Sequence, residues 1–529
     1  MALTELQAVI EQKWPGCVQW QAGINNDAGA ELTCDHTVLA DVCSYIFHNC
    51  NMGFAGLFAE EGSNDWHLRY VFYGDSDHGW IHVLVNRPLA EPGFPSIAVQ
   101  AAIYAADWHE REAEDMFGLR FEDHPRLGDF ILHDDAWQEN VEPMRHGFDA
   151  QAAMDNRLPD TDWRPRRVVH EHGAFIMPIG PKFSGITESV HFLLETVGED
   201  VIRSWTRLFY KWRAMEKLAE GKPADQVLLL AERFAATTAF AHGLAFCHAF
   251  ESIAGVTVPA RARALRVFLA ELERLRQHAG AIHEICESTA LVVAASQAAI
   301  LEEELLRISG QLSGHRYLFG VLAPGGLQTD IPSSACNQAL VSARDVLRRL
   351  NELERRLTLS SSFLDRLEEV GVIWNRTAVA YSLVGPVARA SGLARDLRRI
   401  QPYSGYESFE FDVPLEDEGD GYARLRVLFA EARQSVHIME QAAAALTEGK
   451  VCEPIVAQAG SGLGWVETPR GGTFHWLRLD DNGRVARYHA VTPSFINWHS
   501  FHLAAEKFAF QDFPIILSTF DLSVAENDR

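Results

Sequence analysis

Residues 108–132 read WHEREAEDMFGLRFEDHPRLGDFIL, and this stretch decides how the first part of the chain is organised. With the residues before it, the stretch predicts one helix over 95–118. That helix ends at Gly118, because glycine readily adopts the left-handed conformation that closes a helix. Upstream, residues 65–89 hold two segments that alternate polar and apolar side chains, as half-buried strands do. Together these patterns predict a small α/β domain over residues 1–150.

A second, larger domain is expected downstream. Residues 151–167 are polar and contain proline, which predicts a linker. Residues 168–529 follow, with apolar side chains at helical spacing in three long blocks, 208–308, 342–369 and 422–446. These lengths suit a helical bundle with strands at its periphery, and Asp481-Asn482-Gly483 predicts a hairpin turn near the end. The predicted fold class is therefore α+β.

Composition excludes several kinds of function. The 529 residues include 47 Lys+Arg and 72 Asp+Glu, a net charge of −25, which argues against a nucleic-acid partner. The eight cysteines form no CxxC pair, so no zinc finger or iron–sulfur cluster is encoded locally. No uncharged run approaches the roughly 18 residues of a membrane helix, so any membrane role is expected to go through partners.

Several motifs carry a resemblance to known redox proteins. The stretch 108–132 resembles the signature of the 30-kDa subunit of respiratory complex I, through Glu110, Arg111, Glu112, Asp115, Phe117, Gly118, His124 and Pro125. Segments 207–220, 383–406 and 462–479 look like the 49-kDa subunit of complex I. They are closer still to the large subunit of membrane-bound energy-converting [NiFe] hydrogenases of the formate hydrogenlyase or hydrogenase-4 type. The resemblance implies a 30-kDa-like domain fused to a large 49-kDa-like domain.

In the related hydrogenases, four thiolates from two motifs hold a [NiFe] centre, and the resemblance implies which residues of this chain occupy those positions. The early motif, R-x-C-G-x-C, matches Arg233, but its two cysteines and its glycine are replaced by Ala235, Thr238 and Ala236. The cysteine positions of the late motif are Ser523 and Glu526. Nickel requires soft sulfur ligands, so these positions predict no Ni–Fe centre. Hard oxygen ligands would allow at most weak binding of Mg²⁺.

In complex I relatives a histidine and an Asp–Tyr pair serve a quinone. By resemblance the histidine position is Phe183, in the same segment as Thr187, and the pair coincides with Ala235 and Ala236. Reduction of a quinone needs a general acid within hydrogen-bond reach. The remaining cavity candidates are Glu188, His191, Glu216, Glu232, Arg233 and His242.

Each candidate also has a structural interpretation. Arg233 and Glu232 could form a functional pair or a buried structural ion pair. His242 lies on an apolar helix, which favours a satisfied core histidine, and Glu216 follows Arg213 at the spacing of a helical ion pair. A structural charge network is predicted for Asp396 with Arg389 and Arg398.

Two hypotheses follow. In the first, the chain is the peripheral-arm large subunit of an ion-translocating oxidoreductase, on the cytoplasmic side of the inner membrane, with a cavity that serves a quinone or another acceptor. The resemblance implies an Fe–S small subunit with a 4Fe-4S cluster and quinone-site and antiporter-like membrane-arm subunits as partners. In the second, the chain is an inactive scaffold that joins these partners. A cavity lined by Glu188, Arg233 or His242 favours the first, and one filled by Phe183, Trp212 and Trp498 favours the second.

Overall fold

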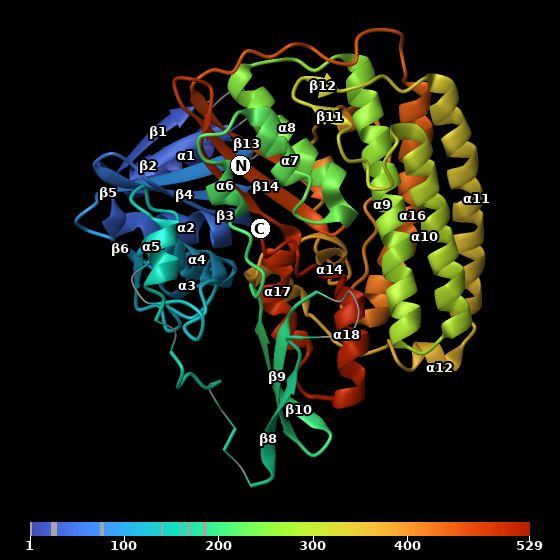
Figure 1. Cartoon of the computed structure of the whole chain (residues 1–529), viewed down its shortest axis with the longest axis horizontal. Helices are drawn as coiled ribbons and strands as arrows, with labels where there is room; N and C mark the ends of the chain where they lie inside the picture. The colour runs from blue at the N-terminus through green and yellow to red at the C-terminus, as the bar shows by residue number, and fades with distance from the viewer. Residues whose placement is uncertain are drawn as a thin grey trace.

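The computed structural model describes residues 3–22, 29–74, 79–138, 141–158, 160–165, 167, 169–170, 172–182 and 188–529. A strand-rich N-terminal part is followed by a large helical part with strands at its periphery, which confirms the predicted α+β class (Figure 1). The segment predicted as a linker, 151–167, contains most of helix α5 (Ala150–Asp155). The domain boundaries themselves stay predictions. No helix in the described part of the chain is both long and apolar enough to cross a membrane.

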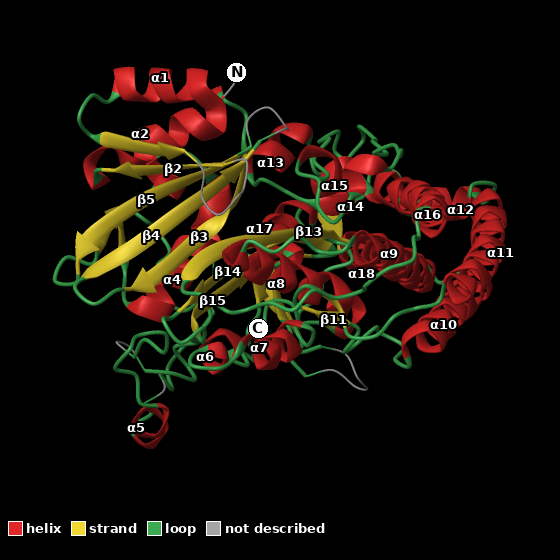
Figure 2. Ribbon diagram, turned by 90° about the horizontal axis from the view of Figure 1, so that it is seen from above, coloured by secondary structure: helices red, strands yellow, loops and turns green. Residues whose placement is uncertain are grey.

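The N-terminal part is built on a five-stranded sheet in the order β1-β2-β5-β4-β3. Its strands are β1 (Val18–Ala22), β2 (Gly29–Cys34), β3 (Gly53–Glu61), β4 (Asp65–Tyr73) and β5 (Trp80–Pro88). Only the β2–β5 pair is parallel among the described strands of this sheet. Helices α1 (Leu3–Lys13) and α2 (Leu39–Ser44) cover one face, and α4 (Asp107–Phe117) lies on the other (Figure 2). The two strands predicted within 65–89 are therefore confirmed as β4 and β5.

The single helix predicted over 95–118 is wrong in its first half. The structure has α3 (Ile97–Gln100), a short 3₁₀ turn (Tyr104–Ala106) and then α4. Between them Ala102 adopts φ +52°, a left-handed conformation that stops a helix. The buried Glu110 carboxylate on α4 accepts hydrogen bonds from the backbone N–H groups of Ile97 (2.7 Å) and Ala98 (3.2 Å) at the start of α3. One continuous helix would keep these groups about 20 Å apart, so the contact requires the break. The predicted end at Gly118, with φ +74°, is confirmed.

The helical part contains a bundle of four long helices that lie side by side in Figure 1. These are α9 (Ala260–Ser288), α10 (Val292–Ser313), α11 (Ser333–Leu357) and α16 (Gly421–Ala444). The block predicted over 422–446 corresponds closely to α16. The block predicted over 342–369 is shifted: α11 begins at Ser333, directly after the extended residue Pro332, and ends at Leu357. A short helix, α12 (Ser361–Leu364), follows it.

Two further sheets belong to the second part of the chain. One is the antiparallel sheet of β13 (Gly460–Thr468), β14 (Gly471–Leu479) and β15 (Val485–Val491), which lies beside β3 (Figure 2). Gly483, with φ +71°, lies in the predicted hairpin turn between its last two strands. The other contains β8 (Ala174–Ile179), β9 (His191–Val197), β10 (Asp200–Arg207) and β16 (Phe508–Ala509), and it extends away from the body (Figure 1).

Helix α8 (Ala239–Ala254) packs directly onto β13. The two backbones approach so closely that a Cβ atom at Gly464 would lie 1.9 Å from the carbonyl oxygen of Ala245. Only glycine fits this position without moving the backbone. The close contact brings the start of α8 to the turn between β13 and β14, where the candidate site lies.

The charge network predicted for Arg389, Asp396 and Arg398 is confirmed. Arg398 binds Asp396 (2.7 Å), and Arg389 binds Glu431 (2.5 Å) and Glu467 (2.8 Å). All of these side chains are buried. The network therefore ties the segment 385–398 to α16 and β13 inside the core.

Candidate functional site

The structure brings two of the four sequence-predicted metal positions into direct contact. Thr238 ends a 3₁₀ turn immediately before α8, and Glu526 lies in the C-terminal tail. The Thr238 hydroxyl donates a hydrogen bond to Glu526 Oε1 at 2.8 Å, and both residues are fully buried. Ala235 and Ser523 are also buried, at the start of the turn and in the same tail. Two motifs 288 residues apart thus form one site.

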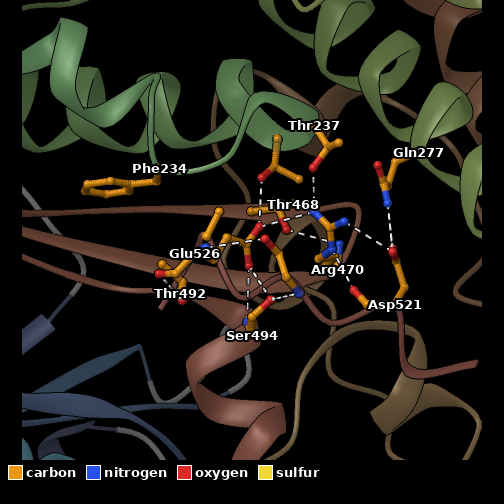
Figure 3. Close-up of polar contacts among 12 residues, drawn as sticks. Phe234, Thr237, Gln277, Thr468, Arg470, Thr492, Ser494, Asp521 and Glu526 are labelled. Carbon is orange, nitrogen blue, oxygen red and sulfur yellow. Dashed lines mark hydrogen bonds and ion pairs between the residues drawn. The ribbon is translucent and has the colours of Figure 1, made fainter. Parts of the chain in front are cut away.

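Glu526 is the centre of this site (Figure 3). Its second oxygen, Oε2, accepts a hydrogen bond from the hydroxyl of Ser494 at 2.5 Å, at the start of α17 (Pro493–Ala504). Arg470, from the turn between β13 and β14, places its Nη1 3.4 Å from Oε1. The same guanidinium also donates to Thr237 (2.8 Å) and pairs with Asp521 (3.2 Å). Both carboxylate oxygens of Glu526 are therefore occupied.

Sequence reasoning did not assign Arg470, Ser494 or Asp521. The signal for Arg470 was present, because the stretch VETPRGG (466–472) belongs to the segments that carry the resemblance. Arg470 follows the end of β13, and its guanidinium can neutralise a buried carboxylate such as that of Glu526. The partnership depends on the fold, however, since 56 residues separate Arg470 from Glu526.

The charge on Glu526 is stabilised by its neighbours. Burial acts to raise the pKa of this carboxyl, but Arg470, His242 and Ser494 outweigh it and lower the pKa from 4.5 to about 2. The carboxylate is therefore ionised at neutral pH although it is buried. Ion pairing and hydrogen bonds satisfy the charge within the protein.

The Glu526→Gln substitution is expected to lower the free energy of unfolding at neutral pH by about 1–3 kcal/mol, because the amide loses the charge that faces Arg470. The folded-state pKa lies below the unfolded value. The stabilisation is thus fully present above pH 4.5 and is lost as the pH falls through about 2. Urea denaturation of both proteins across this range measures the difference, which should shrink in acid. The exposed Glu448, replaced by glutamine, serves as the control. A difference that does not change with pH would contradict the prediction.

His242 lies next to Glu526 and begins a row of buried polar rings. Its Nε2 is 3.5 Å from Glu526 Oε1, and its Nδ1 is 3.3 Å from Nε2 of His475. The other nitrogen of His475 is 2.9 Å from the hydroxyl of Tyr488. Burial, reinforced by His242, lowers the pKa of His475 well below its usual value. His242 is fully buried, with the Glu526 carboxylate facing one ring nitrogen and His475 facing the other.

Glu188 and Ser523 lie at the edge of the site. The Glu188 carboxylate accepts a hydrogen bond from the backbone N–H of Val524 (2.5 Å) and one from the Ser523 hydroxyl (3.4 Å). Glu188 therefore anchors the C-terminal tail. His191, on β9, faces the hydroxyl of Tyr210 instead, at 3.2 Å.

Residues Phe183 and Thr187 lie outside the described residues. The aromatic side chains expected to fill a cavity with Phe183 are Trp212 and Trp498. Trp498 is buried and its indole N–H lies 3.5 Å from the carbonyl oxygen of Ser523. Trp212 is half-buried.

The Glu232–Arg233 pair is not part of the site. Glu232 is buried, and its carboxylate accepts hydrogen bonds from the backbone N–H of Gly320 (3.1 and 3.2 Å). The Arg233 side chain is 48% exposed, lies 3.9 Å from Glu232 and covers the ring of Phe319. It therefore points to the surface. The two residues form an ion pair at 3.9 Å in which Glu232 is buried and Arg233 is about half exposed, so the pair is not buried as a whole.

Glu216 makes different contacts from those predicted. Its carboxylate binds His489 (2.8 Å) and Arg529 (3.1 Å), whereas Arg213 donates to the backbone carbonyl groups of residues 233, 234, 525 and 528. The helical ion pair with Arg213 is wrong, because Arg213 lies just before α6 (Met215–Ala219) and turns toward the tail. Arg529 also binds Glu112 on α4, at 2.7 Å. This buried cluster joins the N-terminal part to the end of the chain.

The donor atoms at the predicted metal positions are all oxygens. Thr238 and Ser523 offer hydroxyl groups, Glu526 offers a carboxylate that is already hydrogen-bonded at both oxygens, and Ala235 offers no donor. Nickel in such centres depends on thiolate sulfur. These residues do not fit a [NiFe] centre.

Comparisons with known proteins agree with the architecture. Residues 32–153 match the family described as "Respiratory-chain NADH dehydrogenase, 30 Kd subunit", and residues 292–459 and 451–529 match "Respiratory-chain NADH dehydrogenase, 49 Kd subunit". The chain is 28% identical to formate hydrogenlyase subunit 5 of Escherichia coli and 28% identical to hydrogenase-4 component G of the same organism. Each alignment covers 99% of this chain and 92% of the relative. It is also 26% identical to the C/D subunit of NADH-quinone oxidoreductase from a Hydrogenobaculum species, over 96% of this chain and 93% of the relative.

Proposed function

Because the chain is a fusion of a 30-kDa-subunit domain and a 49-kDa-subunit domain of the respiratory-chain NADH dehydrogenase families, we propose that it is the large peripheral-arm subunit of a membrane-associated, ion-translocating oxidoreductase complex. The end-to-end similarity to subunits of formate hydrogenlyase, hydrogenase-4 and NADH-quinone oxidoreductase supports this proposal. Its partners would be an Fe–S small subunit with a 4Fe-4S cluster and the membrane-arm subunits. The complex would place the chain on the cytoplasmic side of the inner membrane.

Within this complex, the site around Glu526 would act as a structural joint without a Ni–Fe centre. The observation that carries this is the 2.8 Å hydrogen bond between Thr238 and Glu526. In place of four sulfur ligands, the site contains hydroxyl and carboxylate oxygens. These oxygens hydrogen-bond to one another, and the Glu526 carboxylate pairs with the Arg470 guanidinium. Such a network holds the C-terminal tail against α8 and α17. The chain would thereby preserve the interfaces of its complex and transmit movement between partners.

Quinone reduction is the second candidate, and His242 favours it. A quinone takes up two protons when it is reduced, and a general acid must lie within hydrogen-bond reach. His242, whose Nε2 faces Glu526 and whose Nδ1 faces His475, begins a short row of groups that continues to Tyr488 and can exchange protons. This role would require a quinone to reach the site from an opening shared with a partner subunit.

Purification of the complex through a tag on this chain tests both candidates. We expect metal analysis to find iron from the Fe–S partner but nickel far below one atom per chain. Stoichiometric nickel would overturn the proposal for the Glu526 site. Mass spectrometry should identify an Fe–S subunit and membrane-arm subunits, and recovery of the chain without partners would overturn the proposed assembly.

Quinone reduction by the same complex, driven by an artificial electron donor, separates the two candidates. If His242 supplies protons, the His242→Gln variant is expected to lose about 10²–10⁴-fold in rate, the usual contribution of a general acid. The Glu448→Gln variant, changed at an exposed residue, should retain the wild-type rate. An intact complex with its Fe–S partner that reduces no quinone would exclude this candidate and leave the structural joint.

A further inference from the structure

A separate cavity of about 360 Å³ lies between the two parts of the chain. Its wall is formed mainly by helix α4, residues 125–130 and 163–165, strand β10 and helix α17. None of the residues that bind Glu526 lines it. Its volume is within the range of small-molecule sites in proteins. It is therefore distinct from the site described above.

The wall of this cavity carries a strong positive charge. It contains a single carboxylate, Asp129, and five arginines: Arg111, Arg126, Arg164, Arg203 and Arg207. Burial lowers the pKa of the lining residues His499 and His502 to about 3 and about 4, so both imidazoles are neutral at pH 7. In a chain with a net charge of −25, this concentration of cations is unusual. The cavity is therefore suited to an anion.

Two of these cations form no direct ion pair in the described part of the chain. Arg207 is held by Asp129 (3.0 Å) and Asp135 (2.6 Å), so its charge is compensated. By contrast, Arg126 is exposed, and Arg203 is half-buried with Glu506 as a longer-range electrostatic neighbour. Neither side chain forms an ion pair or a hydrogen bond in the described part of the chain. Guanidinium groups bind phosphate oxygens through two parallel hydrogen bonds. Guanidinium groups that form no ion pair can therefore bind the phosphate of a ligand in the cavity.

Aromatic rings form a large part of the remaining wall. The half-buried indole rings of Trp163 and Trp205 line the cavity together with Phe130 and Phe209. The Arg207 guanidinium lies 4.0 Å from the centre of the Trp163 ring, which holds that ring in position. The indole N–H of Trp205 and the hydroxyls of Ser204 and Thr206 have no hydrogen-bond partner among the described residues. Flat apolar surfaces next to guanidinium groups suit a ligand with a ring and an anionic group.

We propose that this cavity binds a phosphorylated small molecule, with its phosphate at Arg126 and Arg203 and its flat or apolar body against Trp163 and Trp205. The same chemistry is offered by a free nucleotide and by the headgroup of a phospholipid. In both cases the ligand would bind at the junction of the N-terminal part, β10 and α17. Binding there would couple the two parts of the chain.

Calorimetric titration of the full-length protein tests this proposal. The probes are adenosine monophosphate, adenosine, and dihexanoyl phosphatidylglycerol below its micelle concentration. We expect adenosine monophosphate to bind and adenosine to bind at least about tenfold more weakly, because it lacks the phosphate. Arg126→Ala and Arg203→Ala should each weaken phosphate-dependent binding by about tenfold, and binding should weaken as salt is added.

The control is Arg355→Ala, since Arg355 is an exposed arginine on α11 that pairs with Glu352 far from the cavity. Thermal unfolding of all variants checks that they remain folded, which is expected because Arg126 and Arg203 break no ion pair when removed. Binding of phosphatidylglycerol in preference to the nucleotide, with the same loss in both variants, supports the proposal with a lipid as the source. The proposal is overturned if neither phosphorylated probe binds, if adenosine binds as tightly as its monophosphate, or if both variants bind like the wild type.

Discussion

Replacement of Arg529 by alanine is expected to destabilise the protein by about 3–5 kcal/mol, the usual cost of removing one partner from a buried ion pair. Arg529 is buried between the carboxylates of Glu112 (2.7 Å) and Glu216 (3.1 Å). Burial acts to lower the pKa of Arg529, but these two carboxylates outweigh it and raise the pKa. Without the guanidinium, two buried negative charges would face each other.

Urea denaturation followed by circular dichroism measures this loss. Because Glu112 belongs to α4 and Glu216 to α6, we also expect the N-terminal part to become more sensitive to limited proteolysis. Arg529→Lys keeps the charge but cannot reach both carboxylates with a planar fork, so its effect should be intermediate. A loss below about 0.5 kcal/mol for Arg529→Ala, within the range of an ordinary surface substitution, would contradict the interpretation.

A second large effect is expected for Arg389→Ala, again about 3–5 kcal/mol. Arg389 is fully buried and binds Glu431 at 2.5 Å and Glu467 at 2.8 Å. Burial would raise the pKa of Glu431, yet Arg389 and His278 hold it well below its usual value. Loss of Arg389 would leave carboxylates on α16 and β13 without their main cation.

The measurement is the free energy of unfolding near neutral pH. A matched control is Arg344→Ala, because Arg344 also binds a glutamate, Glu440, at 2.6 Å, but its side chain is 54% exposed. An exposed pair of this kind contributes about 0–1 kcal/mol, so the two arginines should differ by several fold. Equal losses in the two variants would show that burial does not govern the strength of the network.

Local patterns predicted those elements whose hydrogen bonds are made within a short stretch of chain. The alternation over 65–89 predicted β4 and β5, and Gly118 predicted the end of α4, because strand alternation and left-handed caps are properties of neighbouring residues. The break at Ala102 was missed. It allows the side chain of Glu110 to bind backbone groups 12 and 13 residues away, a contact that local periodicity does not reveal.

The sequence by itself determined the order of the two parts, the α+β class, and the chemical types at the four predicted metal positions. It could not assign the partners of the buried charges. Glu216 follows Arg213 at helical spacing, yet it binds Arg529, 313 residues away. Only the tertiary structure decided that Arg470 faces Glu526, that Arg233 points outward, and that five arginines surround one cavity. The physical reason is that a buried charge is stabilised by whichever opposite charge or donor the fold places within about 3 Å, and distance along the chain has no part in that energy.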